Sequence, residues 1–530
     1  MEKTFTLNTK SGSAMSLQAP LRWEGITTGR PARVTPCTAS PPKLWSSNSP
    51  RTKSDNQMSS CRSLRLKVHL PILLFGHLAK RILPMKALLG TCCIAATFLL
   101  ALCLFASDVL AASKDPAKPN VIILFSDDAG YNEFSMHGAE LFPTPRINSI
   151  AANGVRFTNG YVSGTVCSPS RAGLLTGRYQ NRFGHEFNIP PAYSETNGLP
   201  LEETTIADVM KQAGYQTIAL GKWHLGYAPK FHPMERGFTD FYGFLQGSRS
   251  YFPLDKPNRL NQLLRDREPV TPESFEYMTD ELALAAADYI AQSEDRPFFM
   301  YVAFNAIHTP NHVLQADLDS LGGDSRQAKH RAMTIALDRA VGTVLDAIEQ
   351  QEIKDNTIVI FLNDNGGATG HDNTPLRGKK GSAWEGGIRV PFVMQWPGKI
   401  AAGKVVDEAV IALDIFPTAM SAAGVSQSPG LPLDGTDLMP FLTGKTPTPP
   451  HKTLFWKSGA NWAVRDGNLK LVVATGGSGE PELYDLSQDA EEKVNIATQH
   501  PEQVKKMETM YMEWKKDFPT PTWGGGRAKM

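Results

Sequence analysis

Short, almost wholly apolar runs alternate with longer amphipathic segments in the body of the chain, from about residue 119 onward. Residues 121–125 read Val-Ile-Ile-Leu-Phe between Pro-Asn and Ser, which is typical of a strand buried on both faces of a parallel sheet. The other expected strands are 155–161, 217–220, 298–304, 357–362 and 390–396, and the expected helices are 144–154, 206–214, 275–293 and 327–350. This alternation predicts an α/β fold in which a large, mostly parallel sheet is flanked by helices.

The pattern changes after a Pro/Thr-rich segment at residues 446–450. Short strand patterns separated by Asp-Gly and Gly-Gly turns follow, and an amphipathic helix pattern closes the chain. These segments are the strands 462–465, 469–474 and 483–485 and the helix 501–518. We therefore expect a main domain at residues 113–445 and a small antiparallel α+β subdomain at residues 451–530.

The front of the chain has a different composition. Residues 1–84 are rich in Ser, Pro, Thr, Lys and Arg and have few periodic apolar positions, so they are expected to be low-complexity sequence outside the mature protein. Met85-Lys86, the apolar run 88–105 and the small residues near Ala111 are the three parts of a secretory signal. We predict a signal peptide at residues 85–112 and an exported protein, periplasmic or extracellular. The alternatives are Met1 as the true start and an uncleaved anchor, because the run is near the minimum that spans a bilayer.

Composition excludes some classes of function. The 530 residues are 41% hydrophobic and 20% charged, as in ordinary globular proteins. The formal net charge is +1 and the body has no run of Lys and Arg, so no nucleic-acid partner is expected. Five of the six cysteines precede residue 104, so a chain cleaved after the signal would keep Cys167 alone, without a disulfide and without a stable membrane span.

That cysteine stands in the segment Cys167-Ser168-Pro169-Ser170-Arg171, at a strong helix start. Ser168 is a candidate N-cap and Pro169 suits the first helical position. The helix should run towards Gly177, and its N-terminus would favour negative charge near residue 167. A lone cysteine is more often a small buried apolar residue, so a chemical role needs support from the rest of the chain.

Polar residues follow two of the expected strands. Asp127 and Asp128 come directly after residues 121–125, and Asp364 and Asn365 come after residues 357–362. In open α/β sheets, ligands bind in the crevice at the carboxyl ends of the strands. Each pair alone could be a turn, but together they offer four oxygen donors that suit a hard cation, Ca²⁺ or alternatively Mg²⁺.

The twelve residues from Cys167 to Arg178, Cys-Ser-Pro-Ser-Arg-Ala-Gly-Leu-Leu-Thr-Gly-Arg, resemble the signature of the formylglycine-dependent (type I) sulfatases, and the resemblance extends over about residues 119–518. It implies the alkaline-phosphatase-like α/β fold and a cysteine that a separate maturation enzyme oxidises to formylglycine. The metal ligands it implies are Asp127, Asp128, Asp364 and Asn365, and the catalytic residues it implies are Cys167, Arg171, Lys222, His224, His308 and Lys380. Lys380 is preferred to Lys379 because the family reads Leu-Arg-x-x-Lys-Gly ahead of Glu-Gly-Gly.

Substrate contacts are expected from two loops, residues 184–198 and 247–271, which carry Tyr, Phe, Asn and Arg suited to sugars. Ser248 is the candidate for a family serine that contacts the nucleophile, with Ser250 as the alternative. His185 and His371 are expected to flank the pocket mouth and to contact substrate.

The expected function is hydrolysis of sulfate monoesters, on a sulfated carbohydrate or an aryl sulfate. In the family mechanism, the hydrated aldehyde attacks sulfur, His308 protonates the leaving alcohol and His224 helps to expel sulfate. Two alternatives stay open. One is a phosphonate or phosphodiester hydrolase of the same superfamily, and the other is a non-catalytic binder of sulfated glycans.

Overall fold

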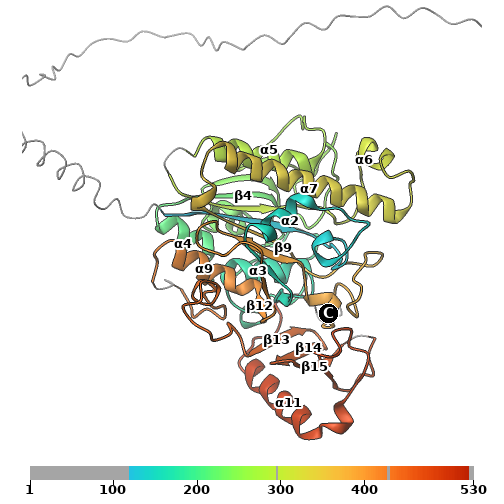
Figure 1. The fold of residues 1–530 in the computed structure, drawn as a ribbon. Helices are drawn as coiled ribbons and strands as arrows, with labels where there is room; N and C mark the ends of the chain where they lie inside the picture. Colours follow the sequence, from blue (N-terminus) through green and yellow to red (C-terminus); the bar gives the residue numbers. More distant parts are fainter. Residues whose placement is uncertain (1–117, 294–295, 427–429, 475, 525–530) are drawn as a thin grey trace, which may run out of the picture. The chain divides into compact units, whose positions relative to one another are not determined.

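The computed structural model describes residues 118–293, 296–426, 430–474 and 476–524. The predicted signal peptide and the segment before it lie outside these residues, so both stay predictions. A ten-stranded sheet forms the centre of the described part (Figure 1). Its strands, in spatial order, are β11 (Lys404–Val406), β2 (Val155–Phe157), β10 (Phe392–Gln395), β9 (Thr357–Asn363), β1 (Asn120–Ser126), β8 (Phe298–Ala303), β4 (Gln216–Lys222), β5 (Asp240–Phe244), β6 (Leu264–Arg265) and β7 (Glu268–Pro269).

The five adjacent strands β9, β1, β8, β4 and β5 are parallel, and β1 lies between β9 and β8. Every residue of β1 is buried, which explains its continuous apolar sequence. Phe125 of β1 pairs with Ala303 of β8, and Ser126 pairs with Asn363 of β9. Because these strands end level with one another, the residues that follow them meet at one edge of the sheet.

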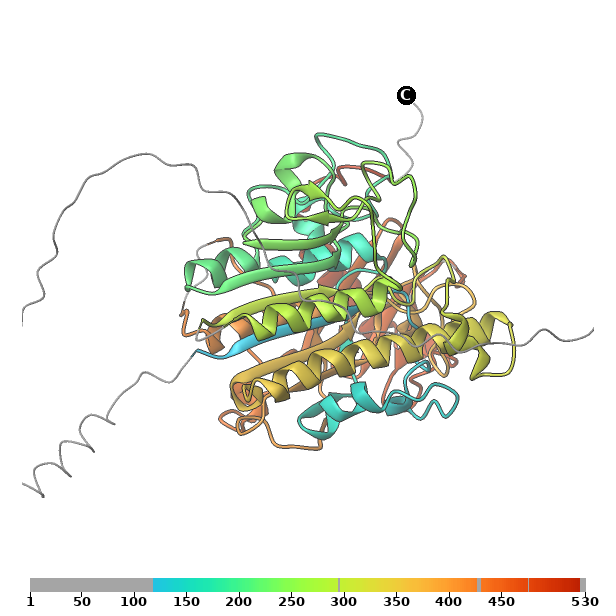
Figure 2. The same cartoon turned by 90° about the horizontal axis from the view of Figure 1, so that it is seen from above.

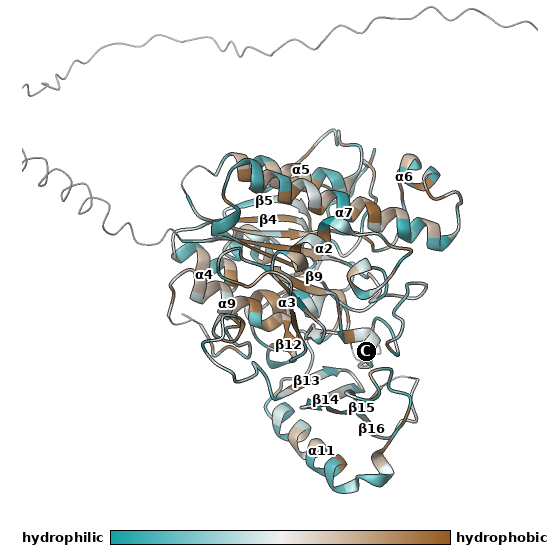
Figure 3. Ribbon diagram, viewed as in Figure 1, coloured by the Kyte–Doolittle hydropathy of each residue, from teal (hydrophilic) through white to brown (hydrophobic). Residues whose placement is uncertain are grey.

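Helices cover both faces of the sheet, as the sequence pattern predicts (Figures 1 and 2). The helices α2 (Pro145–Ala152), α5 (Met278–Ala291) and α7 (Arg326–Gln350) lie on one face, and α3 (Cys167–Thr176), α4 (Ile206–Gln212) and α9 (Ile415–Ala422) lie on the other. Alternate residues of β1 serve the two cores: Ile122 packs with the first group of helices and Ile123 with the second. Apolar residues are concentrated in the strands, whereas α5, α7 and α11 carry many hydrophilic positions (Figure 3).

A separate four-stranded antiparallel sheet follows in the chain, with α11 (Pro501–Lys515) packed on it. Its strands are β13 (Thr453–Ser458), β14 (Asn461–Asp466), β15 (Leu469–Val473) and β16 (Glu482–Asp485). Trp462 of β14 stacks on Tyr511 of α11, with ring centroids 4.3 Å apart. The fully buried Trp456 donates its indole N–H to the Val162 carbonyl at 2.7 Å, which ties this sheet to the main body. The predicted fold class is therefore confirmed, while the domain boundaries stay a prediction.

The structure corrects two expected strands. Residues 155–161 form two short strands, because β2 joins the large sheet while β3 (Gly160–Tyr161) pairs with β12 (Val410–Ile411) in a sheet of its own. β10 runs antiparallel to β9, because the chain turns back at the carboxyl end of β9 and does not first cross to the other end of the sheet. The sequence pattern also missed β5 and β13.

The remaining α-helices of the described residues are the short α6 (Gln315–Asp319), α8 (Glu385–Ile388) and α10 (Met439–Leu442). Among the described residues, no helix has both the length and the apolar character needed to cross a membrane.

A fully buried ion cluster joins α8 to the C-terminal sheet. Lys470 Nζ lies 2.8 Å from Glu385 Oε1 and 2.8 Å from Glu492 Oε1, and all three side chains are 0% exposed. Burial acts to raise the pKa of Glu385, but Lys470, Arg389 and Arg465 together outweigh it and hold that pKa at about 2. Burial raises the pKa of Glu492 to about 7 despite the same lysine. Lys470 is therefore shared by two buried carboxyl groups, and Glu385 is also 3.5 Å from Arg389 Nη1.

Replacing this cation should destabilise the protein. We expect Lys470→Met to lower the free energy of unfolding by about 3–5 kcal/mol, because it leaves the buried Glu492 carboxyl without its cation and Glu385 with only the more distant Arg389. Urea denaturation measures the change. The control is Lys493→Met, whose exposed ammonium contacts Glu491, and it should leave stability nearly unchanged because water screens an exposed ion pair. An equal, small effect of both substitutions would contradict the role given to Lys470.

A second ion pair makes stability depend on pH. His451 Nε2 lies 2.6 Å from Asp414 Oδ1, and the Asp414 side chain is 0% exposed. Burial alone would lower the pKa of His451, but Asp414 raises it above the ordinary 6.5. Since the folded pKa exceeds the unfolded one, the stabilisation is complete below the unfolded pKa and is lost as pH rises through the folded pKa.

We therefore expect His451→Gln to cost about 1–2 kcal/mol near pH 5.5 and clearly less near pH 8.5. Thermal unfolding of both proteins across this range measures the difference. A gap that stayed constant or widened with rising pH would contradict the assignment.

Candidate active site

The lone cysteine begins a helix that the sequence predicts well. Cys167 is the first residue of α3, is 1% exposed and is the only free cysteine among the described residues. The helix ends at Thr176, and Gly177 caps it with a positive φ of 64°, a conformation that favours glycine. The predicted N-cap is wrong: the N-cap is Val166, and Ser168 lies inside the first turn. The Ser168 hydroxyl instead donates to the His224 carbonyl at 2.7 Å.

The four predicted metal ligands converge beside this cysteine. Asp127 and Asp364 are 0% exposed and Asp128 is 3% exposed, and they follow the two strands that end in register. The Asp128 amide donates to Asp364 Oδ1 at 3.3 Å, and Asn365 Nδ2 donates to Asp128 Oδ1 at 2.8 Å. Asn365 Oδ1 is buried and has no hydrogen-bond partner in the described part of the chain. Three carboxylates and an unpartnered amide oxygen fit a hard cation such as Ca²⁺ or Mg²⁺.

The candidate metal-binding groups also include two donors of another kind. Single atoms of Asp127, Asp128, Cys167 and His308 lie within 4.8 Å of one another, close enough to hold one ion. Two of the predicted ligands, Asp127 and Asp128, thus lie with Cys167 and His308 around one possible ion position at the edge of the sheet.

Three cations balance the three carboxylates. Arg171 Nη2 lies 2.8 Å from Asp364 Oδ2 and 3.5 Å from Asp127 Oδ2. Lys222 Nζ lies 2.5 Å from Asp127 Oδ2, and the side chains of Arg171 and Lys222 are 0% exposed. Lys380 Nζ lies 2.5 Å from Asp128 Oδ1 and 3.1 Å from Cys167 Sγ, whereas Lys379 is exposed. The structure thus brings Arg171, Lys222 and Lys380 to the cysteine and the carboxylates.

The electrostatics of the cluster differ from group to group. Burial acts to raise the pKa of Asp128, but Lys380 and His308 hold it well below its usual range. Burial, together with the charge of Asp127, raises the pKa of Asp364 to about 6. Burial, together with Asp364, also raises the pKa of the Cys167 thiol to about 12. Because the thiolate is the nucleophilic form, the unmodified cysteine is a poor nucleophile in this setting.

Two histidines complete the set. His224 is 5% exposed, has a positive φ of 57° and leaves Nδ1 without a hydrogen-bond partner among the described residues. Burial and the neighbouring Lys222 and Arg171 place its pKa well below 6.5. His308 donates from Nδ1 to the Thr309 carbonyl at 2.6 Å, which leaves Nε2 3.5 Å from Asp128 Oδ2. Burial and Lys222 lower the pKa of His308 to about 4, so both rings are neutral near pH 7.

The predicted substrate contacts take other places. His185 is 0% exposed, with Nε2 2.6 Å from Ser168 Oγ and its ring edge-on to Trp523. His371 is 2% exposed in its side chain and contacts Glu133 at 2.8 Å. Both rings are therefore buried against these partners, and their role as substrate contacts stays a prediction. The half-buried Ser248 donates to the Thr309 carbonyl at 2.8 Å, next to His308, and the alternative Ser250 lies 3.3 Å from His312.

A further cluster, Glu133 with His330 and His371, escaped the sequence analysis. Its donor atoms lie within 4.8 Å of one another, but the two imidazole rings are parallel, with an interplanar angle of 1° and centroids 3.9 Å apart. An imidazole binds a metal ion in the plane of its ring, so two parallel rings cannot both direct a nitrogen at one ion. Glu133 instead accepts from the Gly130 amide at 2.7 Å and contacts both rings. It joins the loops that follow β1 and β9 to α7, and so supports the candidate ligands from behind.

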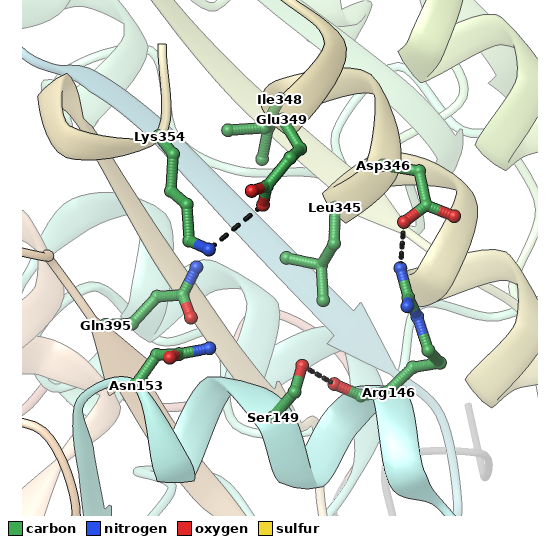
Figure 4. Close-up of a pocket in the computed structure, with 9 residues that line it drawn as sticks. All are labelled: Arg146, Ser149, Asn153, Leu345, Asp346, Ile348, Glu349, Lys354 and Gln395. Carbon is green, nitrogen blue, oxygen red and sulfur yellow. Dashed lines mark hydrogen bonds and ion pairs between the residues drawn. The ribbon is translucent and has the colours of Figure 1, made fainter. Parts of the chain in front are cut away.

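A surface pocket between α2 and α7 lies away from this chemistry (Figure 4). Gln395, which lines it, pairs with Val359 near the start of β9, whereas Asp364 follows the end of β9. The pocket therefore lies at the opposite edge of the sheet. Its charged residues pair with one another, Arg146 with Asp346 and Lys354 with Glu349.

Comparison with known proteins agrees with this geometry. A family model described as "Sulfatase" matches residues 119–425, and one described as "N-sulphoglucosamine sulphohydrolase, C-terminal" matches residues 379–517. Arylsulfatase A of Homo sapiens is 36% identical over 442 residues, which covers 73% of this chain and 85% of that protein. N-acetylgalactosamine-6-sulfatase of Canis lupus familiaris is 33% identical over 360 residues, which covers 63% of this chain and 68% of that protein.

Among solved structures, Ps i-CgsB in complex with k-i-k-neocarrahexaose is similar, with a TM-score of 0.72 and 31% identity. The match covers 77% of this chain and 95% of that chain.

Proposed function

The chain belongs to the sulfatase family and is a sulfatase, and we propose that it hydrolyses sulfate monoesters of a carbohydrate with a formylglycine made from Cys167 and a bound Ca²⁺, or alternatively Mg²⁺. The observation that carries this proposal is the convergence of Cys167 with three buried carboxylates and three cations at one edge of the sheet. The names of relatives support the carbohydrate substrate. One is an N-acetylgalactosamine-6-sulfatase, and a similar structure holds a neocarrahexaose.

Cys167 Sγ stands in for one hydroxyl oxygen of the hydrated formylglycine. The modification supplies one hydroxyl that attacks sulfur and a second whose deprotonation releases sulfate. Asp127, Asp128, Asp364 and Asn365 would hold the cation, which supplies positive charge to the attacking oxygen and to the sulfate.

The basic residues have distinct roles in this scheme. Lys222 contacts Asp127 and Lys380 contacts Asp128. Both lysines would donate to the sulfate oxygens, which reduces the repulsion between an anionic ester and an oxygen nucleophile. Arg171 is held by Asp364 and by the Lys222 carbonyl at 3.1 Å, so it is positioned to orient and neutralise the nucleophile.

Proton transfer falls to the two histidines. His308 is 18% exposed in its side chain and lies on the open side of the site, where the leaving alcohol would depart. Bound sulfate adds negative charge, which raises the proton affinity of His308 and suits it to protonate that alcohol. His224 is buried on the closed side with Nδ1 unpartnered, and it would take the proton from the second hydroxyl.

The modification can be tested directly. In protein from a host that matures sulfatases, the tryptic peptide of residues 157–171 should be lighter by about 18 Da, as a thiol becomes an aldehyde. The same protein should hydrolyse p-nitrophenyl sulfate, and Cys167→Ala should lose at least about 10³-fold in kcat. An unmodified peptide in fully active protein would disprove the formylglycine. Faster turnover of bis(p-nitrophenyl) phosphate would favour the phosphodiesterase alternative.

The cation can be tested without activity. Protein freed of metal with a chelator should gain thermal stability when Ca²⁺ is added, by about 2.7 kcal/mol at a hundredfold excess over Kd. Asp128→Asn should reduce this gain because it removes a ligand charge, while Asp372→Asn, in the nearby loop, should retain it. A gain that is the same in all three proteins would place the cation elsewhere.

A further inference from the structure

An open cavity of about 650 Å³ is lined by the chain neighbours of Cys167 and Lys380, and the catalytic scheme above does not use its walls. Val166, directly before Cys167, and Gly381, directly after Lys380, form one side. Phe187 and Asn188 form a second side, and the turn between β13 and β14 forms the third. Its volume is in the range of small-molecule binding sites.

The second wall is fixed at both ends. The Glu186 carboxylate accepts from Lys457 Nζ at 2.5 Å and from the Gly459 amide, both in the β13–β14 hairpin. Asn188 Oδ1 accepts from the Ser168 amide at 2.9 Å, in the first turn of α3. Trp523 donates from its indole nitrogen to the Phe187 carbonyl at 2.9 Å. Such ties hold the wall in place before any ligand arrives, which reduces the entropy cost of binding.

The chemistry of the lining selects one kind of ligand. None of the side chains that line the cavity is charged, although Lys380 and its ion partners are one residue away. Phe187 is half-buried and offers an apolar ring surface, and the Asn188 amide and the Ser458 hydroxyl offer hydrogen bonds. An uncharged lining does not compensate a second sulfate group, whereas a flat apolar face with nearby amides suits a hydroxylated ring.

We propose that this cavity is the subsite for an uncharged sugar ring of the leaving alcohol, which stacks on Phe187 and hydrogen-bonds to Asn188. This assignment rests on the proposed sulfatase function and narrows it. The sulfate lies against Lys222 and Lys380, and the sugar that carries it extends towards the β13–β14 hairpin. The C-terminal sheet then contributes to substrate selection as well as to stability.

The test compares sugar and aryl esters on the matured enzyme. The probes are N-acetylgalactosamine 6-sulfate, k-i-k-neocarrahexaose and p-nitrophenyl sulfate. Phe187→Ala should lower kcat/KM for the better sugar probe, relative to p-nitrophenyl sulfate, by about fivefold to tenfold, mainly through KM. Phe187→Trp should restore the ratio of kcat/KM for the sugar probe to kcat/KM for p-nitrophenyl sulfate, because it keeps an aromatic face.

The matched control is Phe441→Ala, because Phe441 is also a half-buried phenylalanine packed on the same core cluster but lies outside the cavity. In Phe441→Ala, the ratio of kcat/KM for sugar to kcat/KM for aryl ester should stay within about twofold of the ratio in the unsubstituted enzyme. An unchanged ratio in Phe187→Ala, or equal losses on sugar and aryl esters, would overturn the subsite.

A binding measurement separates this proposal from the function itself. Calorimetric titration of the Cys167→Ala protein with the same two sugars needs no turnover, and Phe187→Ala in that background should weaken binding by about fivefold or more. Binding that needs Phe187 would support the subsite even if no sulfate ester were hydrolysed. If p-nitrophenyl sulfate is hydrolysed but neither sugar binds, the subsite fails and the sulfatase chemistry stands.

Discussion

Three buried carboxylates at one point are the constraint on which the rest of the site depends. Charges removed from water are costly unless opposite charges and hydrogen bonds compensate them. Here the compensation comes from three separate elements: Arg171 from α3, Lys222 from the end of β4 and Lys380 from the loop after β9. Each element is therefore held to the same edge of the sheet. A bound cation and an anionic ester would redistribute these contacts, with the lysines turning from carboxylates to sulfate.

The C-terminal sheet is part of this arrangement rather than an appendage. Lys470 reaches Glu385 in α8, which follows the loop of Lys380 by a few residues. On its other side, the β13–β14 hairpin contacts Glu186 and closes a cavity beside Cys167. The same small sheet thus compensates buried charge in the main body and shapes the space next to the nucleophile.

The four histidines predicted to belong to the site fall into two groups, which differ in the hydrogen-bond partners of their rings. His308 keeps Nε2 3.5 Å from Asp128, and His224 keeps Nδ1 without a hydrogen-bond partner among the described residues, so a nitrogen of each ring stays available. His185 and His371 use their nitrogens to hold Ser168 and Glu133, which in turn position α3 and the loops of the candidate ligands. Residue type is the same in both groups, and the partners decide between a chemical and a supporting role.

The sequence by itself determined the parallel strands, the helix that ends before Gly177 and the polar pairs at the strand ends. These features are local. An apolar run predicts a buried strand, and the polar residues that follow it in the chain must lie at the end of that strand. Tertiary structure decided the direction of β10, the N-cap at Val166 and the burial of His185 and His371. It also formed the cavity beside Phe187. Each of these depends on contacts between segments that are distant in sequence, and such contacts leave no periodic signal in the chain.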